Sequence, residues 1–253
     1  MHSTIRDRVL QSRTLTEEIH LFAYPRVGSH FLAYCLHGLY DLVALESTRS
    51  DNPEVTAREQ ELDPHALYAL ELREDGAAYQ PLWVNAIANG VHGMPVSSPN
   101  RSIILIREPQ ATIYSLYRVN RDRWGGSSDA AAPAEAAAWI DQRLTDYHDF
   151  YQRAFSIRGT DPTRICLVRY EDLSGSPKAL ADVTAFIGKP TKLSPEFVFW
   201  VTSFGRFALA GPDRTFFRTG NNSAYIDDSL WQALSASIDP IRWTGFGYGR
   251  KSV

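Results

Sequence analysis

Short apolar runs alternate with longer segments of mixed polarity along this chain, and the alternation predicts its secondary structure. Three runs of five or six residues are almost wholly apolar: 19–24 (IHLFAY), 102–106 (SIILI) and 165–170 (ICLVRY). Continuous apolar runs of this length are typical of parallel strands that are buried on both faces of a sheet. Each run therefore predicts a buried strand.

Segments with helical spacing follow these strands. They cover residues 29–42, 110–121 and 177–187, with Gly188 as the stop signal of the last, and a further helical pattern covers 134–154. Strand followed by helix, repeated along a chain, favours a layered α/β fold. We expect a P-loop-like fold with a central, mainly parallel sheet flanked by helices.

The polar connections between these units are too short to require a domain boundary. Residues 48–64 are charged and residues 124–138 are rich in Gly, Ser and Ala. We expect one domain over residues 1–253, with 124–138 as a flexible flap. Residues 204–228 contain several glycines, which predicts a loop.

The amino-acid composition argues against nucleic acid and a membrane as partners. The formal net charge is −3, from 26 basic and 29 acidic side chains, so the chain lacks the overall positive charge with which proteins attract nucleic acid. An anion site must therefore be local. No apolar stretch of 18 residues and no secretion signal is present, and the two cysteines lie in apolar runs, as expected for reduced, buried thiols. These features favour a cytoplasmic protein without a membrane span.

The turn after the first predicted strand has the composition of an anion site. Its sequence from Ala23 to Phe31 is AYPRVGSHF. A helix that begins near Gly28 points its free N–H groups at one spot, where Arg26 adds a fixed positive charge and Ser29 a hydroxyl. The alternative is that Ser29 is only a helix N-cap and Arg26 a solvated turn residue.

This turn resembles the 5′-phosphosulfate loop of the sulfotransferases that use 3′-phosphoadenosine 5′-phosphosulfate (PAPS), whose usual form is TYPKSGTTW. A second segment, ILIREPQATIYSLYR, resembles the 3′-phosphate element of that family: Arg107 leaves a strand, and Ser115 follows eight positions later. The resemblance implies that both elements bind the nucleotide. On the first loop it assigns nucleotide contacts to Arg26, Val27, Gly28, Ser29, His30 and Phe31.

Two further segments extend the resemblance. The sequence RYEDL is similar to the family's strand-to-helix segment, which implies that Tyr170 lies near the adenine. The sequence FFRTG resembles the C-terminal loop that closes over the 3′-phosphate, with Arg218, Thr219 and Gly220, although Thr219 replaces the family lysine. Residues 204–228 are therefore expected to close over the bound nucleotide.

The resemblance also implies a general base. In many family members a histidine between the two phosphate elements removes the acceptor's proton, and His92 matches it by order. His30, beside the reacting group, is the second candidate, and Arg26 is the candidate for stabilising charge on the leaving phosphate. No metal-ligand pattern is present, and the family requires no metal.

The sequence thus predicts an enzyme that transfers a sulfuryl group in line from PAPS to a hydroxyl or amine of a small-molecule, sugar or lipid acceptor, leaving adenosine 3′,5′-bisphosphate. Two alternatives stay open. A P-loop kinase shares the fold and the anion loop, but the Walker pattern GxxxxGK[ST] is absent. A non-catalytic nucleotide-binding module would keep the site without turnover. The sequence does not indicate an oligomeric state.

Overall fold

The computed structural model describes residues 18–40, 43–48, 82–87, 101–123, 133–156 and 161–202, together with six positions nearer the C-terminus (Trp231, Gln232, Leu234, Ala236, Ile238 and Tyr248). In this part of the chain, no helix has the length and apolar character needed to cross a membrane.

The centre of the fold is a five-stranded sheet in which every pair of neighbouring strands is parallel. Its order is β2-β3-β1-β4-β5. The strands are β1 (Glu18–Ala23), β2 (Val43–Thr48), β3 (Leu82–Ile87), β4 (Arg101–Ile106) and β5 (Ile165–Arg169). The α/β fold with a central parallel sheet is confirmed.

The three predicted strands correspond to β1, β4 and β5, whereas β2 and β3 were not predicted. The predicted helix 29–42 was too long: it ends at Leu39, Tyr40 is already extended, and β2 starts at Val43. The apolar residues of 42–45 fit a helix or a strand equally well, because so short a run has no decisive period. Pairing with β3 decides in favour of a strand.

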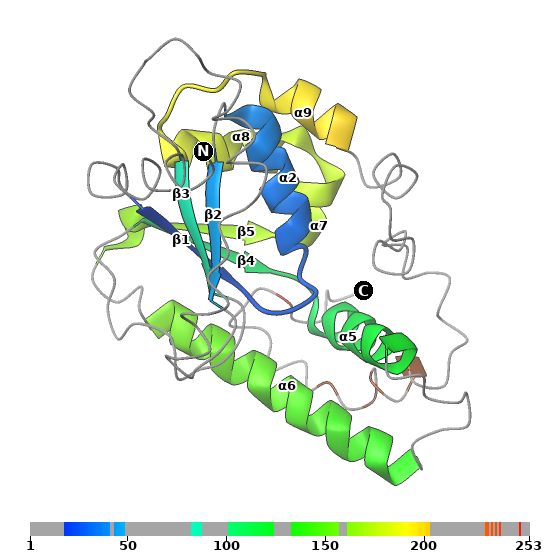
Figure 1. Ribbon diagram of the computed structural model, residues 1–253. Helices are drawn as coiled ribbons and strands as arrows, with labels where there is room; N and C mark the ends of the chain where they lie inside the picture. The colour runs from blue at the N-terminus through cyan, green and yellow to red at the C-terminus, as the bar shows by residue number, and fades with distance from the viewer. Residues whose placement is uncertain are drawn as a thin grey trace, which may run out of the picture.

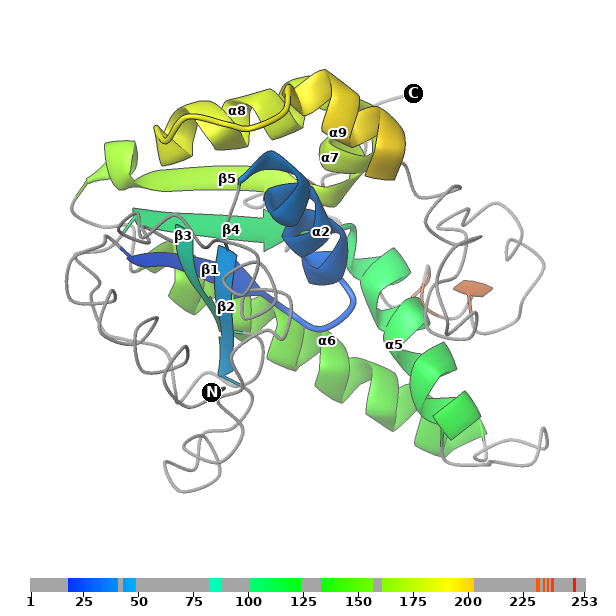
Figure 2. The ribbon, with the colours of Figure 1, turned by 45° about the horizontal axis from the view of Figure 1, so that its top comes forward.

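Helices cover both faces of the sheet (Figures 1 and 2). On one face lie α2 (Ser29–Leu39), α8 (Pro177–Ile187) and α9 (Pro195–Thr202), with the short α7 (Tyr170–Gly175). On the other lie α5 (Pro109–Arg123) and α6 (Pro133–Ser156). The core lies between these layers and the sheet, and the side chains of Ile103, Ile104, Leu105 and Ile106 are fully buried.

Local signals set the helix ends. Helix α8 ends before Gly188, which has a φ of 69° as a left-handed C-cap needs, and this confirms the predicted stop. Helix α6 starts at Pro133, so residues 133–138 of the predicted flap are helical instead, with Pro at a helix start where its missing N–H costs nothing. The remainder of the flap, 124–132, and the loop 204–228 fall outside the described residues.

The order of the strands creates a place for a ligand. From β1 the chain passes through α2 on one face, and from β4 it passes through α5 and α6 on the other. Because β1 and β4 are neighbours, the chain segments that follow them start side by side and then run to opposite faces of the sheet. In open α/β sheets ligands bind in the crevice at such a switch point.

Candidate nucleotide-binding site

The turn after β1 has a backbone that is held in an unusual conformation. Arg26 has a φ of 73° and Gly28 a φ of 99°, both in the left-handed region, and the Val27 N–H donates a hydrogen bond to the Tyr24 carbonyl over 3.3 Å. Arg26 is the only described residue other than glycine with a positive φ. Such strain in a residue other than glycine persists only where the surroundings enforce it, and it occurs most often at functional sites.

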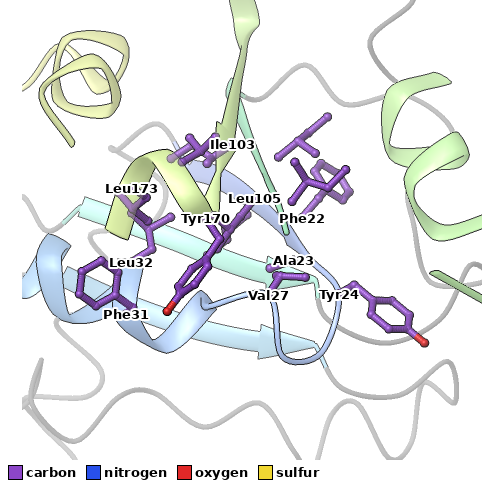
Figure 3. Close-up of a cluster of buried hydrophobic side chains, with 14 of the residues drawn as sticks. Phe22, Ala23, Tyr24, Val27, Phe31, Leu32, Ile103, Leu105, Tyr170 and Leu173 are labelled. Atoms are coloured by element: carbon purple, nitrogen blue, oxygen red, sulfur yellow. The ribbon is translucent and has the colours of Figure 1, made fainter. Parts of the chain in front are cut away.

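Gly28 is the N-cap of α2, and a tyrosine ring occupies the space where a side chain would lie. A Cβ at Gly28 would lie 2.3 Å from Cδ2 of Tyr170. Figure 3 shows the Tyr170 side chain reaching from α7 towards this turn, beside Phe31, whose ring is edge-on to it at 6.4 Å between centroids. Tyr170 therefore packs directly against the backbone at the start of α2.

Arg107 follows β4 and lies at the centre of the site. Its side chain is 8% exposed, its Nη1 donates to the carbonyl oxygen of Arg26 over 3.1 Å, and its guanidinium lies 4.8 Å from the ring centroid of Tyr170. Within the described residues it forms no ion pair with a carboxylate. A buried charge costs free energy unless it is paired, so this arrangement favours the binding of an anion.

Arg26 connects the two predicted phosphate elements. Its Nε donates a hydrogen bond to the Ser115 hydroxyl of α5 over 3.3 Å, while its carbonyl oxygen accepts from Arg107. Two guanidinium groups and one hydroxyl thus lie close together where the loops after β1 and β4 begin. Both cations come from loops that follow neighbouring strands, so the sheet fixes their spacing.

Burial shapes the electrostatics around these cations. Burial raises the pKa of the Tyr170 hydroxyl above its usual value, although Arg107 and Arg26 oppose the shift, so Tyr170 is neutral at physiological pH. Burial, and then the neighbouring Glu171 carboxylate, raise the pKa of Glu108, against the effect of Arg107. Both shifts disfavour the ionised form of a group that neighbours Arg107.

Glu171 joins three segments at the rim of the site. Its carboxylate accepts a hydrogen bond from the Glu108 N–H over 2.9 Å and another from the Tyr248 hydroxyl over 2.8 Å. Tyr248 in turn lies under the Arg169 guanidinium, 4.6 Å from the ring centroid. The carboxylate thereby ties the loop after β4 and the C-terminal segment to α7.

The described residues among the predicted contacts occupy one region. Val27 and Phe31 are buried, whereas Ser29 and Ser115 are half-buried. The alternative role of Ser29 as N-cap is wrong, because Gly28 holds that position and no side chain caps this end of the helix. His30 is exposed in the first turn of α2. Four predicted residues lie outside the described residues: His92, Arg218, Thr219 and Gly220.

Three contributors to this region were not predicted as site residues: Tyr147 and Tyr151 of α6, and Glu171 as a link between loops. Tyr147 and Tyr151 are four residues apart in a helical pattern, so the sequence does indicate that they lie on one helix face. Their partners are backbone atoms of β4 and of the loops that follow β1 and β4, which no sequence pattern specifies. Across the described part of the chain, no cluster of three His, Cys, Asp or Glu side chains could hold a metal ion.

Comparisons with known proteins identify the fold. No family model and no curated protein matches the chain. Among solved structures, mouse sulfotransferase SULT7A1 complexed with PAP is similar at 18% identity, over 91% of this chain and 82% of that chain, with a TM-score of 0.56. The sulfotransferase domain from the curacin biosynthetic pathway is similar at 15% identity, over 92% and 98% of the two chains, with a TM-score of 0.51.

Retinol dehydratase is similar in two structures. The one in complex with androsterone and the inactive cofactor PAP shares 14% identity over 93% of this chain and 82% of that chain, with a TM-score of 0.55. The one in complex with retinol and PAP shares 16% identity over the same fractions of the two chains, with a TM-score of 0.54. At these identities the likeness concerns the fold, and it extends over almost the whole chain. The chain therefore has the sulfotransferase fold.

Proposed function

We propose that this protein is a sulfotransferase that uses PAPS as the sulfuryl donor and releases adenosine 3′,5′-bisphosphate (PAP). The observation that carries the proposal is Arg107, a buried cation without a carboxylate partner among the described residues, which is joined through Arg26 to Ser115. A nucleotide with phosphate groups at two positions matches two such elements at the carboxyl ends of adjacent strands. The PAP in three of the similar structures supports the same ligand class.

In this proposal the 5′-phosphosulfate lies over the turn 25–29, where the N–H groups at the start of α2 and the helix dipole favour an anion. Arg107 and Ser115 bind the 3′-phosphate, and Tyr170 packs near the adenine. The Arg26 side chain contacts Ser115 in the structure, so we assign its charge to both phosphate elements rather than to the leaving phosphate alone. Arg218, Thr219 and Gly220 are proposed to close over the 3′-phosphate.

Transfer requires the donor and acceptor to be held in line, negative charge on the bridging oxygen to be stabilised, and the acceptor's proton to be removed. Arg26 and the N–H groups of the turn supply the stabilising charge. We propose His92 as the general base, with His30 as the alternative, since His30 is exposed at the mouth of the turn. The proposed acceptor is the hydroxyl or amine of a small molecule, sugar or lipid; the retinol dehydratase neighbours were crystallised with retinol and with androsterone.

Thermal unfolding with added ligands tests the nucleotide class. A ligand that binds only the folded state raises the unfolding temperature, so PAP should stabilise the protein and ATP with Mg²⁺ should not. Stabilisation by ATP that depends on Mg²⁺, without any by PAP, would instead favour a P-loop kinase. Adenosine 5′-monophosphate is the matched control, because it lacks the 3′-phosphate.

Single-turnover transfer of labelled sulfate from PAPS to a panel of alcohols, phenols and amines separates an enzyme from a binding module. Transfer to any member of the panel supports the proposed chemistry. If PAP binds but no label leaves PAPS, the binding-module alternative is favoured.

The variant His92→Ala tests the general base. It should lose sulfuryl transfer and keep PAP binding. If His92→Ala is still active, His30 becomes the candidate for the base.

A further inference from the structure

Two tyrosine hydroxyls of α6 reach the carboxyl ends of β1 and β4, where the proposed phosphate contacts begin. Tyr147 and Tyr151 lie one helical turn apart and are fully buried, with 0% of each side chain exposed. They pack against each other at 4.7 Å between ring centroids. Neither side chain takes part in the proposed transfer.

The Tyr151 hydroxyl lies at the point where the pairing of β1 and β4 ends. It donates a hydrogen bond to the Leu105 carbonyl over 2.5 Å and accepts one from the Tyr24 N–H over 3.3 Å. The last paired residues of the two strands are Ala23 and Leu105. The Tyr151 hydroxyl therefore bridges the Tyr24 N–H and the Leu105 carbonyl, in place of a direct hydrogen bond between the two chain segments. It links them at the point where their pairing ends.

The Tyr147 hydroxyl acts one residue beyond β4, where it donates a hydrogen bond to the carbonyl oxygen of Arg107. The Tyr147 ring also packs edge-on against the Tyr24 ring, at 5.2 Å between centroids. Tyr147 thus contacts the residues that begin both loops. Burial raises the pKa of both α6 tyrosines well above the usual value, so both hydroxyls stay protonated and can donate.

We propose that Tyr147 and Tyr151 are positioning residues, which set the spacing between the turn that carries Arg26 and the loop that carries Arg107. The inference rests on the proposed function, because it assigns that spacing to the two phosphate groups of one nucleotide. Neither tyrosine touches the nucleotide in this proposal. Each hydroxyl holds the main chain from which a phosphate-binding side chain projects.

The variants Tyr147→Phe and Tyr151→Phe remove the hydroxyls and keep the rings, so they test the hydrogen bonds alone. Tyr40→Phe is the matched control: Tyr40 is 6% exposed, its hydroxyl has no partner among the described residues, and it follows the far end of α2, about 16 Å along the helix from the turn. The measurements are the dissociation constant for PAP by calorimetry and the amide hydrogen exchange of Tyr24 in the ligand-free protein.

We expect PAP to bind about five- to tenfold more weakly to each α6 variant, as the loss of one buried hydrogen bond implies, and equally well to Tyr40→Phe. Tyr151→Phe should also speed the exchange of the Tyr24 N–H. A merely structural role would lower the unfolding temperature and leave PAP affinity as in the control, and that result would overturn the inference. If Tyr151→Phe does not fold, Tyr147→Phe decides by the same criterion.

The two proposals fail in different ways. If the unaltered protein does not bind PAP, the proposed function is wrong, and the positioning role falls with it. If the unaltered protein binds PAP and all three variants bind it equally well, the proposed function stands and only the positioning role is wrong.

Discussion

The guanidinium of Arg107 donates a hydrogen bond to the carbonyl oxygen of Arg26 over 3.1 Å, across 81 positions of sequence. This contact joins the loops that follow two neighbouring parallel strands, β1 and β4. It also uses a backbone atom, so it depends on the conformation of the turn rather than on the side chain at position 26. The same Arg26 has its backbone in the left-handed region, with a φ of 73°.

Replacing Arg107 should remove recognition of the 3′-phosphate. We expect Arg107→Ala and Ser115→Ala to weaken PAP binding about tenfold to a hundredfold, as the loss of a hydrogen bond to a charged group implies, and to change binding of adenosine 5′-monophosphate far less. Calorimetric titration of both nucleotides checks this. Arg164→Ala is the control, since Arg164 is exposed and precedes the opposite, amino end of β5. Equal losses for both nucleotides would contradict the 3′-phosphate assignment.

Replacing Arg26 should weaken PAP binding with little effect on the free energy of unfolding. Arg26→Asn keeps the main-chain carbonyl that Arg107 uses, and asparagine adopts the left-handed region more readily than arginine does. The free energy of unfolding should therefore change by less than about 1 kcal/mol. PAP binding should fall at least tenfold, because the charge and the hydrogen bond to Ser115 are lost. Urea unfolding and calorimetry measure the two quantities, and unchanged PAP binding would count against a role for the side chain.

A methyl group at position 28 should be poorly tolerated. Gly28→Ala places a Cβ 2.3 Å from the Tyr170 ring and requires a φ of 99°. We expect the free energy of unfolding to fall by about 2–4 kcal/mol in urea denaturation. Gly175→Ala is the control, because a Cβ there would meet nothing within 4 Å. If both variants unfold at the same urea concentration, Tyr170 does not pack closely against Gly28.

The raised pKa of Glu108 predicts a stability that depends on pH. Because the folded protein binds this proton more tightly than the unfolded chain, Glu108 lowers stability progressively as the pH rises above its ordinary pKa of 4.5. The neutral variant Glu108→Gln should therefore be more stable than the parent at pH 7, and the difference should vanish towards pH 4. Thermal unfolding from pH 4 to pH 8 checks this, with the exposed Glu196→Gln as the control for loss of one charge. A Glu108→Gln variant that is less stable at pH 7 would show that the carboxylate is stabilising.

Part of this site could be predicted from sequence because its residues are adjacent or follow a strand directly. The turn 25–29 and the step from β4 to Arg107 are local, and each carries its own backbone and charge signal. The missed strands β2 and β3 show the limit of that argument. Their short apolar runs become strands by pairing with partners far along the chain, and pairing leaves no period in a single segment.

The sequence by itself determined the alternation of strands and helices, and hence a layered parallel sheet with an anion-binding turn. It also placed a cation and a hydroxyl eight positions apart, at Arg107 and Ser115. Only the tertiary structure decided that Arg26 contacts both of them, that Tyr170 fills the space at Gly28, and that α6 holds the ends of β1 and β4. These relations join segments tens of residues apart and depend on the strand order, which a local pattern does not encode.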